Sequence, residues 1–401
     1  MSTFPKVIGE GSYGCIHRPS LKCKNKNTTY KKKVSKILLN RHALKEMDQY
    51  LRVAKADKNA DYYLGKPIIC KLENNKQNID AIQDCEENNN IIENLDDYSL
   101  LVMEDGGNDI NIFVTKMKKM KKISEIKQQL HYFWIGFLHM FEGCELFLKH
   151  NIINHDIKPQ NILYNEKTKR MNFIDFGLMQ SYKKITHKLK KSDFWLAKHS
   201  HWSYPIEIQF LNKNRFDSFC DKSEKERIDF YSTLIYNIKK NIQTYNTDTI
   251  KTLFSYIIPS HNRKKFTETF FNDLLYMITT DICSKPYTYF LKQCLNTIDL
   301  YGIGFTLLYS LNSLEHLLDH NFYHDLSEFA YYLITPRLYE RYSCRDAKIK
   351  YKELLEKHDI FINKYSNLKK TIKKVHTTSF LLSRKKRDKI IHKRIERNTF
   401  L

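Results

Sequence analysis

The spacing of hydrophobic residues changes about a third of the way along the chain. Before that point, short apolar runs alternate with glycine-rich or charged turns, as in a β-sheet. From about Ile123 onward, apolar side chains recur at the intervals of a helix face. They include Leu130, Phe133, Trp134, Phe137, Leu138 and Phe141. A strand-rich part followed by a helix-rich part predicts an α+β fold.

Length and composition narrow the class of protein. With 401 residues, the chain is longer than one hydrophobic core usually supports, so two lobes are expected. A hydrophobic fraction of 42% excludes a disordered chain, and a net charge of +22 predicts acidic partners. The nine cysteines are scattered, with no CxxC pair and no Cys/His ligand spacing. We therefore expect neither a disulfide framework nor a zinc site, and a reducing compartment.

The N-terminal sequence lacks the apolar core of a signal peptide, and no stretch approaches the ~18 apolar residues of a membrane span. The expected location is therefore intracellular, either cytoplasmic or nuclear, without a membrane partner.

Charge is distributed unevenly. Residues 73–97 are acidic and Asn-rich, which predicts a solvated loop or insertion. Residues 361–401 contain 13 Lys and Arg against 2 Asp and Glu and form a basic tail. This tail could bind nucleic acid, direct nuclear import, present a solvated helix face or dock on the acidic stretch.

A glycine-rich run lies between two apolar runs near the start of the chain, Gly9-Glu10-Gly11-Ser12-Tyr13-Gly14-Cys15-Ile16. Glycines let a turn close over phosphates, whose oxygens then face free backbone amides. Pro19 and a polar turn follow, where a dinucleotide-binding motif would need a helix and then an acid. A strand–loop–strand unit is therefore favoured, with an ordinary glycine-rich turn as the alternative.

Lys36 has apolar neighbours in Val34-Ser35-Lys36-Ile37-Leu38, which alternates like a strand with Lys36 on its inward face. A buried lysine needs an anionic partner, either a ligand phosphate or a carboxylate. Glu46, in a helix predicted over Asn40 to Leu51, is the nearest candidate. Alternatively, Lys36 belongs to a solvated cluster with the lysines at 31–33.

The most specific signal is Ile153-Asn154-His155-Asp156-Ile157-Lys158-Pro159-Gln160-Asn161-Ile162-Leu163, followed by Phe173-Ile174-Asp175-Phe176-Gly177. A DxKPxN pattern arises by chance in well under ~1 in 100 chains of this length. One carboxylate can orient a hydroxyl, a lysine can neutralise phosphate charge, and an Asn/Asp pair offers hard oxygens to Mg²⁺. The pattern indicates phosphoryl transfer.

These segments resemble a eukaryotic-type serine/threonine protein kinase, and the order of motifs covers roughly residues 7 to 350. The resemblance implies a bilobal fold that binds ATP with Mg²⁺, or alternatively Mn²⁺. It implies that Lys36 contacts the α- and β-phosphates and pairs with Glu46. Asp156 would be the catalytic base and Lys158 would contact the γ-phosphate, with Asn161 and Asp175 as metal ligands. The implied nucleotide-site residues are Gly9, Glu10, Gly11, Ser12, Gly14, Ile16, Lys36, Glu46, Met103, Glu104, Gly106, Asn161 and Asp175.

Further segments carry the same resemblance. Leu101 to Gly107 resembles the hinge, with Met103 as gatekeeper and the backbone of Glu104 and Gly106 facing adenine. Tyr204-Pro205-Ile206-Glu207 resembles the end of the activation segment, which implies a buried pair between Glu207 and Arg341.

Asp299 resembles the buried aspartate at a helix start that accepts amides of the catalytic loop, with Asp229 as the alternative. Choosing Asp299 implies an insertion of about 80 to 90 residues after Glu207.

The sequence departs from the kinase pattern before the base, where His155 replaces the usual Arg and Asn154 the usual His. Because that Arg gathers a phosphorylated activation loop in the family, activation by this route is not expected. Ser200 is predicted to steady Asp156 and Lys158. The other hydroxyl residues of the segment are Ser181, Thr186 and Ser192.

The expected organisation is an N-lobe over 1–106 with the acidic insertion 73–97, a C-lobe over 107–360 with an insertion at about 208–292, and the basic tail. The expected function is transfer of the ATP γ-phosphate to a protein Ser or Thr. A pseudokinase scaffold and a small-molecule phosphotransferase are the alternatives. The Lys-, Asn- and Ile-rich composition resembles kinases of large DNA viruses, which would allow a virion-associated protein.

Overall fold

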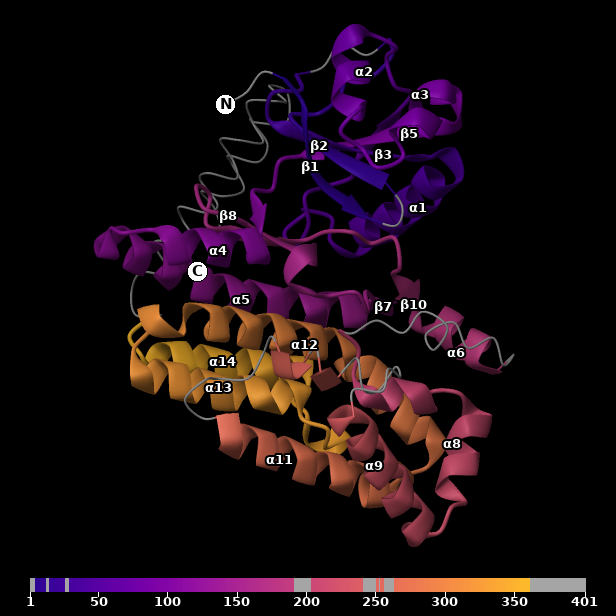
Figure 1. Ribbon diagram of the computed structural model, residues 1–401, viewed down its shortest axis with the longest axis vertical. Helices are drawn as coiled ribbons and strands as arrows, with labels where there is room; N and C mark the ends of the chain where they lie inside the picture. The colour runs from indigo at the N-terminus through magenta and orange to yellow at the C-terminus, as the bar shows by residue number, and fades with distance from the viewer. Residues whose placement is uncertain are drawn as a thin grey trace.

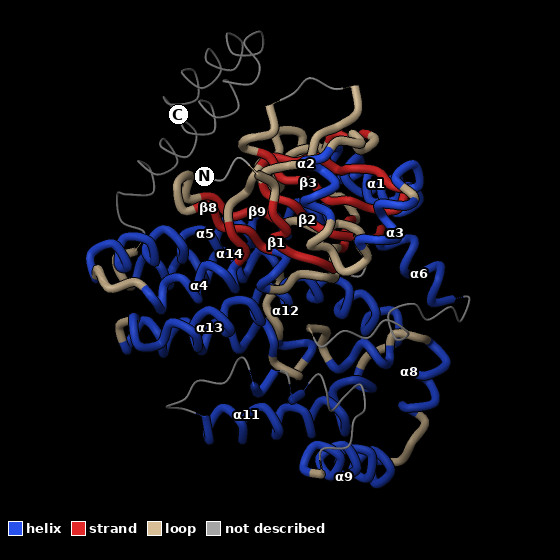
Figure 2. The backbone as a smooth tube through the Cα atoms, turned by 45° about the horizontal axis from the view of Figure 1, so that its top comes forward, coloured by secondary structure: helices blue, strands red, loops and turns tan. Residues whose placement is uncertain are grey.

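Two lobes stack along the long axis of the molecule in the computed structural model of the protein (Figure 1). The structure describes residues 4–11, 14–25, 29–190, 203–240, 250–251, 253–255 and 263–360. Strands gather in the upper lobe and helices fill the lower one (Figure 2). The predicted α+β fold, with a β-rich first part and a helical second part, is confirmed.

The N-terminal lobe is built on an antiparallel five-stranded sheet in the order β1-β2-β3-β5-β4. Its strands are β1 (Lys6–Gly11), β2 (Gly14–Arg18), β3 (Lys33–Leu39), β4 (Ile68–Cys70) and β5 (Tyr98–Glu104). Helix α1 (Asn40–Ala56) follows β3 directly and packs on the sheet through Ala43, which shares a buried cluster with Leu38 and Leu101, whereas Val53 is buried in the larger core that includes the lower lobe. The sheet and α1 therefore fix the side chains of β3 relative to those of α1.

The acidic stretch 73–97 is not the solvated loop that its composition predicts. It forms α2 (Lys76–Ile82), α3 (Asn88–Glu93) and η1 (Leu95–Asp97). Ala81, Ile82 and Ile91 are buried against the sheet, so one side of the stretch belongs to the upper core. These residues and Cys85, which is bonded to Cys15, anchor the short helices, and the sparse apolar pattern among many polar residues hid them.

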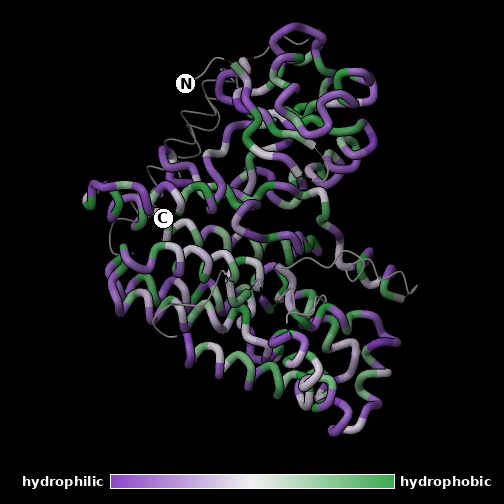
Figure 3. The backbone as a smooth tube through the Cα atoms, viewed as in Figure 1, coloured by the Kyte–Doolittle hydropathy of each residue, from purple (hydrophilic) through white to green (hydrophobic). Residues whose placement is uncertain are grey.

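The C-terminal lobe is a bundle of long helices beneath small sheets. The helices are α4 (Ile110–Lys119), α5 (Ile123–Lys149), α12 (Tyr287–Leu314), α13 (His320–Ile334) and α14 (Cys344–Lys357). The short strands are β6 (Asn108–Asp109), β7 (Ile152–Ile153), β8 (Ile162–Asn165), β9 (Arg170–Phe173) and β10 (Gln180–Ser181). Hydrophobic and hydrophilic residues alternate along the bundle helices in Figure 3, as expected for helices with one face in the core.

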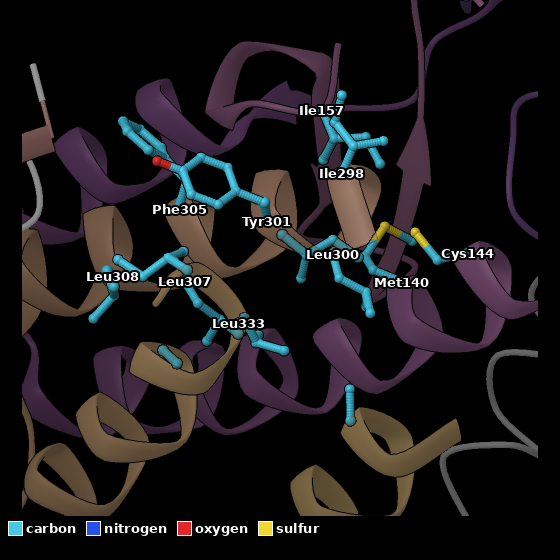
Figure 4. Close-up of a cluster of buried hydrophobic side chains, with 14 of the residues drawn as sticks. Met140, Cys144, Ile157, Ile298, Leu300, Tyr301, Phe305, Leu307, Leu308 and Leu333 are labelled. Atoms are coloured by element: carbon cyan, nitrogen blue, oxygen red, sulfur yellow. The ribbon is translucent and has the colours of Figure 1, made fainter. Parts of the chain in front are cut away.

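Helix α12 is the central element of this lobe and packs against α4, α5 and α13. Figure 4 shows Leu300 of α12 beside Met140 and Cys144 of α5, and Ile298 beside Ile157, which comes from the loop after β7. All of these side chains are buried. The loop after β7 thus rests directly on α12.

The other helical elements of the described residues are shorter or lie after Glu207. They are η2 (Pro159–Asn161), α6 (Tyr182–Lys190), η3 (Ile206–Phe210), α8 (Lys213–Cys220), α9 (Glu224–Lys239), α11 (Arg263–Tyr276), η4 (Met277–Asp281), η5 (Ile282–Ser284), η6 (Glu315–Leu317) and η7 (Leu338–Glu340). Helices α8, α9 and α11 lie in the stretch between Glu207 and Asp299 and form the lower end of the molecule in Figure 1. None of the described helices is long and apolar enough to cross a bilayer.

The expectation of no disulfide framework is wrong. Three disulfides are present, namely Cys15–Cys85, Cys23–Cys70 and Cys220–Cys283. Their partners are 47 to 70 residues apart in sequence, so only the folding of the sheet and of the helices after Glu207 brings them together. The spacing of the cysteines along the chain therefore does not predict these pairs.

Candidate active site

Lys36, on β3 of the upper lobe, pairs with one carboxylate from each lobe. Its Nζ is 2.9 Å from Glu46 Oε2 and 3.4 Å from Asp175 Oδ1. The side chains of Lys36 and Glu46 are each less than a tenth exposed, whereas that of Asp175 is 42% exposed. Lys36 is therefore not part of a solvated cluster, and it joins β3, α1 and the segment after β9.

The charges of this triad are set by burial and by each other. Although burial alone lowers the pKa of Lys36, the carboxylates of Asp175 and Glu46 raise it above its usual value. Burial raises the pKa of Asp175, but Lys36, the Gly177 amide and Lys158 together outweigh burial and hold that pKa below the usual range. Lys36 therefore stays charged and Asp175 ionised at neutral pH, as a site for a phosphate and a divalent cation requires.

The catalytic-loop motif folds into one connected group. Lys158 Nζ lies 3.0 Å from Asp156 Oδ1, and Asn161 Nδ2 donates to both the backbone oxygen and Oδ2 of Asp156, each at 2.8 Å. Burial raises the pKa of Asp156, and Lys158 opposes that shift. The Asp156 carboxylate is thus fixed in orientation by two side chains that follow it in the same loop.

Asn161 and the segment that carries Asp175 are adjacent. The amide of Ile174 donates to the backbone oxygen of Asn161 at 3.1 Å, which places Asp175 one residue from that contact. Asn161 uses Nδ2 for its bonds to Asp156, and these bonds do not involve the lone pairs of its Oδ1. An amide oxygen and a half-exposed carboxylate are hard donors, a set that fits Mg²⁺ or Mn²⁺.

Two residues of the site have left-handed backbone. His155 has φ 47° and Asp175 has φ 57°. Non-glycine residues held in this region cost of order 1–3 kcal/mol and concentrate at functional sites. The strain here lies beside the two carboxylates that would carry the chemistry.

Asp299 holds the catalytic loop from below. Its Oδ2 accepts from Asn154 N at 3.0 Å and its Oδ1 from His155 N at 2.6 Å. Burial raises the pKa of Asp299 to about 6, against the opposing effect of these two amides. The alternative, Asp229, is exposed on α9.

The prediction that Asp299 stands at a helix start is wrong, because α12 already begins at Tyr287. Gly302, one turn after Asp299, explains the close fit of helix and loop. A Cβ there would lie 2.4 Å from the backbone oxygen of Ile157, so any larger residue would push the loop away.

The end of the predicted activation segment is locked into the lower lobe. Glu207 on η3 forms a bidentate pair with Arg341, with Nη2 to Oε2 at 3.1 Å, and both side chains are almost fully buried. Arg341 Nε also donates to the backbone oxygen of Thr335 at 2.7 Å. This pair joins the segment before α8 to the segment before α14.

His155 contacts the same segment, with Nδ1 3.3 Å from the hydroxyl of Tyr204. Burial lowers the pKa of His155 to about 4, so the imidazole is neutral at physiological pH. A neutral, buried ring cannot attract a phosphate as an exposed guanidinium does. The loop contact is therefore a hydrogen bond to a tyrosine.

The described part of the glycine-rich run ends β1 at Gly11 and begins β2 at Gly14, and the two strands pair antiparallel. Gly14 is required by close approach, because a Cβ there would lie 2.1 Å from the backbone oxygen of Ile37. Ile16 is half-buried on β2, and Glu10 Oε1 accepts from Glu86 N at 2.8 Å. Gly9 and Gly11 lie on β1, while Ser12 lies outside the described residues.

The predicted hinge comprises the end of β5 and the residues that follow it. Met103 accepts a hydrogen bond from the Tyr50 hydroxyl at 3.5 Å, and the Glu104 side chain pairs with Lys33 at 2.6 Å. Gly106 packs so closely on Leu163 of β8 that a Cβ would lie 2.7 Å from its Cδ1. Leu163 therefore packs against the predicted hinge at Gly106.

Arg18, at the end of β2, is a contact that sequence analysis missed. Its guanidinium pairs with Asp105 at 2.9 Å and donates to Asn108 Oδ1 at 3.3 Å. It thereby ties the glycine-rich hairpin to the hinge. The only sequence signal was a charged residue at the end of a strand, which is too common to single out.

The hydroxyl residues of the predicted activation segment either bond to nearby backbone or lie outside the described residues. Ser181 Oγ accepts from the amide of Lys184 at 3.2 Å, and Thr186 Oγ1 donates within α6 to Lys183 O at 3.0 Å. Ser192, Ser200 and the basic tail 361–401 lie outside the described residues.

Comparisons with known proteins agree with this geometry. A family model described as ABC1 atypical kinase-like domain matches residues 97–200, which include the hinge, the catalytic loop and Asp175. The "Carbon catabolite-derepressing protein kinase" of Saccharomyces cerevisiae is 26% identical over 175 residues, 43% of this chain and 22% of the yeast protein. The chain thus spans less than a quarter of that relative. Together these similarities support a divergent kinase-like protein.

Proposed function

We propose that the protein is an ATP-dependent serine/threonine protein kinase. The observation that carries the proposal is the joint placement of four groups. Lys36 of the upper lobe contacts Asp175 of the lower lobe, while Asp156 is fixed by Asn161 and Lys158 in the adjacent loop. A protein that only scaffolds partners has no need to keep all of these groups in contact.

In the proposed reaction, a substrate hydroxyl attacks the γ-phosphorus of ATP. A new oxygen–phosphorus bond forms, the bond to the bridging β,γ-oxygen breaks, and ADP leaves with that electron pair. Asp156 orients the hydroxyl and accepts its proton, because its carboxylate is held by Asn161 and Lys158.

The other groups bind and neutralise phosphate. Lys36, held by Glu46, would contact the α- and β-phosphates, and Lys158 would contact the γ-phosphate. Asn161 and Asp175 would hold Mg²⁺, or Mn²⁺, which when bound neutralises phosphate charge. A turn at 9–14 would cover the phosphates with backbone amides.

A protein substrate is favoured over a small molecule by two features. Lys158 stands two residues after the base, as in the serine/threonine class that the motifs resemble. The buried Glu207–Arg341 pair anchors the segment that would face a substrate peptide. The family match is to an atypical kinase-like domain, so an atypical phosphotransferase is the second candidate, and a small-molecule acceptor is tested beside a protein one.

Three further expectations stay predictions. Acidic protein partners rest on the net charge, and nucleic acid binding rests on the basic tail 361–401. The resemblance to viral kinases rests on composition.

The proposal is tested by incubating the full chain with γ-labelled ATP and Mg²⁺. The acceptors are acidic proteins, basic proteins and a set of small-molecule alcohols. Label on Ser or Thr of a protein, absent with Asp175→Ala, is the expected result. Label only on small molecules would favour the second candidate. Nucleotide binding without transfer to any acceptor would indicate a pseudokinase.

A further inference from the structure

Two cysteines and a histidine, Cys15, Cys85 and His17, gather on one face of the glycine-rich hairpin, and the proposed chemistry does not use them. Along β2, Cys15 and His17 are buried, whereas Ile16 between them is half-buried on the opposite face. Since strand side chains alternate, Cys15 and His17 point away from the face that carries Ile16. Cys15 meets Cys85 there in a disulfide with a Cα–Cα separation of 6.0 Å.

Cys85 belongs to a short turn between α2 and α3. Its neighbours Gln83, Asp84, Glu86 and Glu87 are exposed, but Cys85 itself is only 3% exposed. A buried sulfur in an otherwise exposed turn becomes accessible through a small local opening, without unfolding of the lobe.

A second contact joins the same turn to the other strand of the hairpin. The amide of Glu86 donates to Glu10 Oε1 at 2.8 Å, and Glu10 lies on β1. Glu10 and Cys15 are direct partners across the β1–β2 pair. Two consecutive residues, Cys85 and Glu86, therefore hold both strands of the hairpin next to its glycine-rich tip.

We propose that Cys15–Cys85 is a redox-modification site, and that its reduction releases the glycine-rich hairpin. The proposal rests on the proposed function, because the hairpin would cover the ATP phosphates. With the bond closed, the turn at 83–87 limits the motion of the hairpin. With the bond open, the turn at 83–87 is tied to the hairpin tip by the hydrogen bond from Glu86 to Glu10, while His17 keeps its 3.1 Å contact with Ala81 O, and nucleotide is held less tightly.

The co-reactant is a low-molecular-weight thiol. Two such thiols deliver two electrons and two protons, the Cys15–Cys85 bond breaks into two cysteine thiols, and the co-reactant leaves as its disulfide. The reverse reaction needs only that small-molecule disulfide. The step is balanced, and the protein can be poised by the ratio of thiol to disulfide.

The Cys23–Cys70 disulfide provides a matched control. It ties the chain after β2 to β4 in the same lobe, but it does not touch the hairpin tip. Opening it should not affect the position of residues 9–14. The pair Cys23→Ser and Cys85→Ser therefore separates a general loss of lobe stability from a specific effect on the hairpin.

The same cluster offers a rival use. His17 Nε2 lies 3.7 Å from Cys85 Sγ and 4.0 Å from Cys15 Sγ, and three such atoms could bind Zn²⁺ once the thiols are free. The bonded sulfurs favour the disulfide, so zinc binding is treated as an outcome of the test.

The experiment equilibrates the full chain in glutathione buffers of defined ratio. Peptide mapping reports the bond, amide hydrogen exchange reports residues 6–18, and a fluorescent ATP analogue reports affinity. The wild type should show faster exchange in the hairpin and a several-fold weaker nucleotide affinity on reduction. Cys85→Ser should behave like the reduced wild type in every buffer, and Cys23→Ser should keep the response.

Free Cys15 and Cys85 under all oxidising ratios would overturn the proposal. So would hairpin exchange that is identical in the two states, or one equivalent of zinc that is lost in Cys85→Ser. Because exchange and mapping do not depend on catalysis, a redox response without phosphate transfer would contradict the proposed function alone.

Discussion

Lys36 Nζ and Glu46 Oε2 lie 2.9 Å apart, and both side chains are almost completely removed from solvent. The pair links the strand that would contact phosphate to the helix that packs behind it. The upper lobe is thus in an arrangement in which Lys36 already points at Asp175.

Glu46→Gln should reduce kcat/KM by about 10- to 100-fold, because a charge-assisted hydrogen bond contributes ~1.5–3 kcal/mol. The loss should fall mainly on nucleotide use, since Lys36 loses its orientation. The matched control is Glu125→Gln, which removes an exposed pair with Lys122 and should change kcat/KM less than about twofold. Equal effects of the two variants would contradict the role of the buried pair.

Glu207→Ala should lower the free energy of unfolding by about 3–5 kcal/mol, since it leaves the buried Arg341 charge without its carboxylate. Glu356→Ala, which removes a surface pair with Lys352, should cost less than ~1 kcal/mol. Urea unfolding of the two variants measures the difference. A loss below ~1 kcal/mol for Glu207→Ala would show that the pair does not lock the lower lobe.

The acid limb of the activity profile should report Asp156. Because burial raises its pKa, activity should fall with decreasing pH at values above the ordinary ~3.9 of an aspartate. Lys158 opposes that shift, so the residual activity of Lys158→Met should be lost at a still higher pH. A profile of kcat/KM against pH for both proteins tests this, and an unmoved limb would exclude Asp156 as the titrating base.

Asp299 should make stability depend on pH. Its pKa is raised to about 6 in the folded protein and is ~3.9 in the unfolded chain, so the folded state binds the proton more tightly. Its contribution to stability is complete below pH ~3.9 and is lost as pH rises through about 6. Between pH 3 and 7, the wild type should lose roughly 3 kcal/mol relative to Asp299→Asn. Parallel stability curves would show that Asp299 does not titrate in this range.

Phosphatase treatment should leave activity unchanged. His155, neutral and buried with its pKa lowered to about 4, contacts Tyr204 and offers no cation to a phosphorylated loop. Activity assayed before and after complete dephosphorylation checks this. A loss of more than a few-fold would point to a phosphate acceptor elsewhere.

The sequence predicted those parts of the site that lie in contiguous motifs. Asp156, Lys158 and Asn161 meet because they share one loop, and Asp175 is fixed to Asn161 by a backbone hydrogen bond. The contact of Lys36 with Glu46 could be predicted because a strand face and the next helix set it.

Other features depend on long-range packing and left no local signal. The Cys15–Cys85 bond joins two residues that are 70 positions apart and lie next to each other only in the folded lobe. The early start of α12 was also missed. The residues before Asp299 lack the polar cap that marks a helix start, because Pro286 at the N-cap makes no side-chain bond there.

The central claim is tested most directly by single-turnover transfer from ATP, with wild type and Asp156→Asn compared at equal nucleotide occupancy. The account predicts that Asp156→Asn binds ATP and Mg²⁺ as tightly as the wild type, within about threefold, and transfers phosphate ~10²- to 10⁴-fold more slowly. Transfer by Asp156→Asn at the wild-type rate would contradict it.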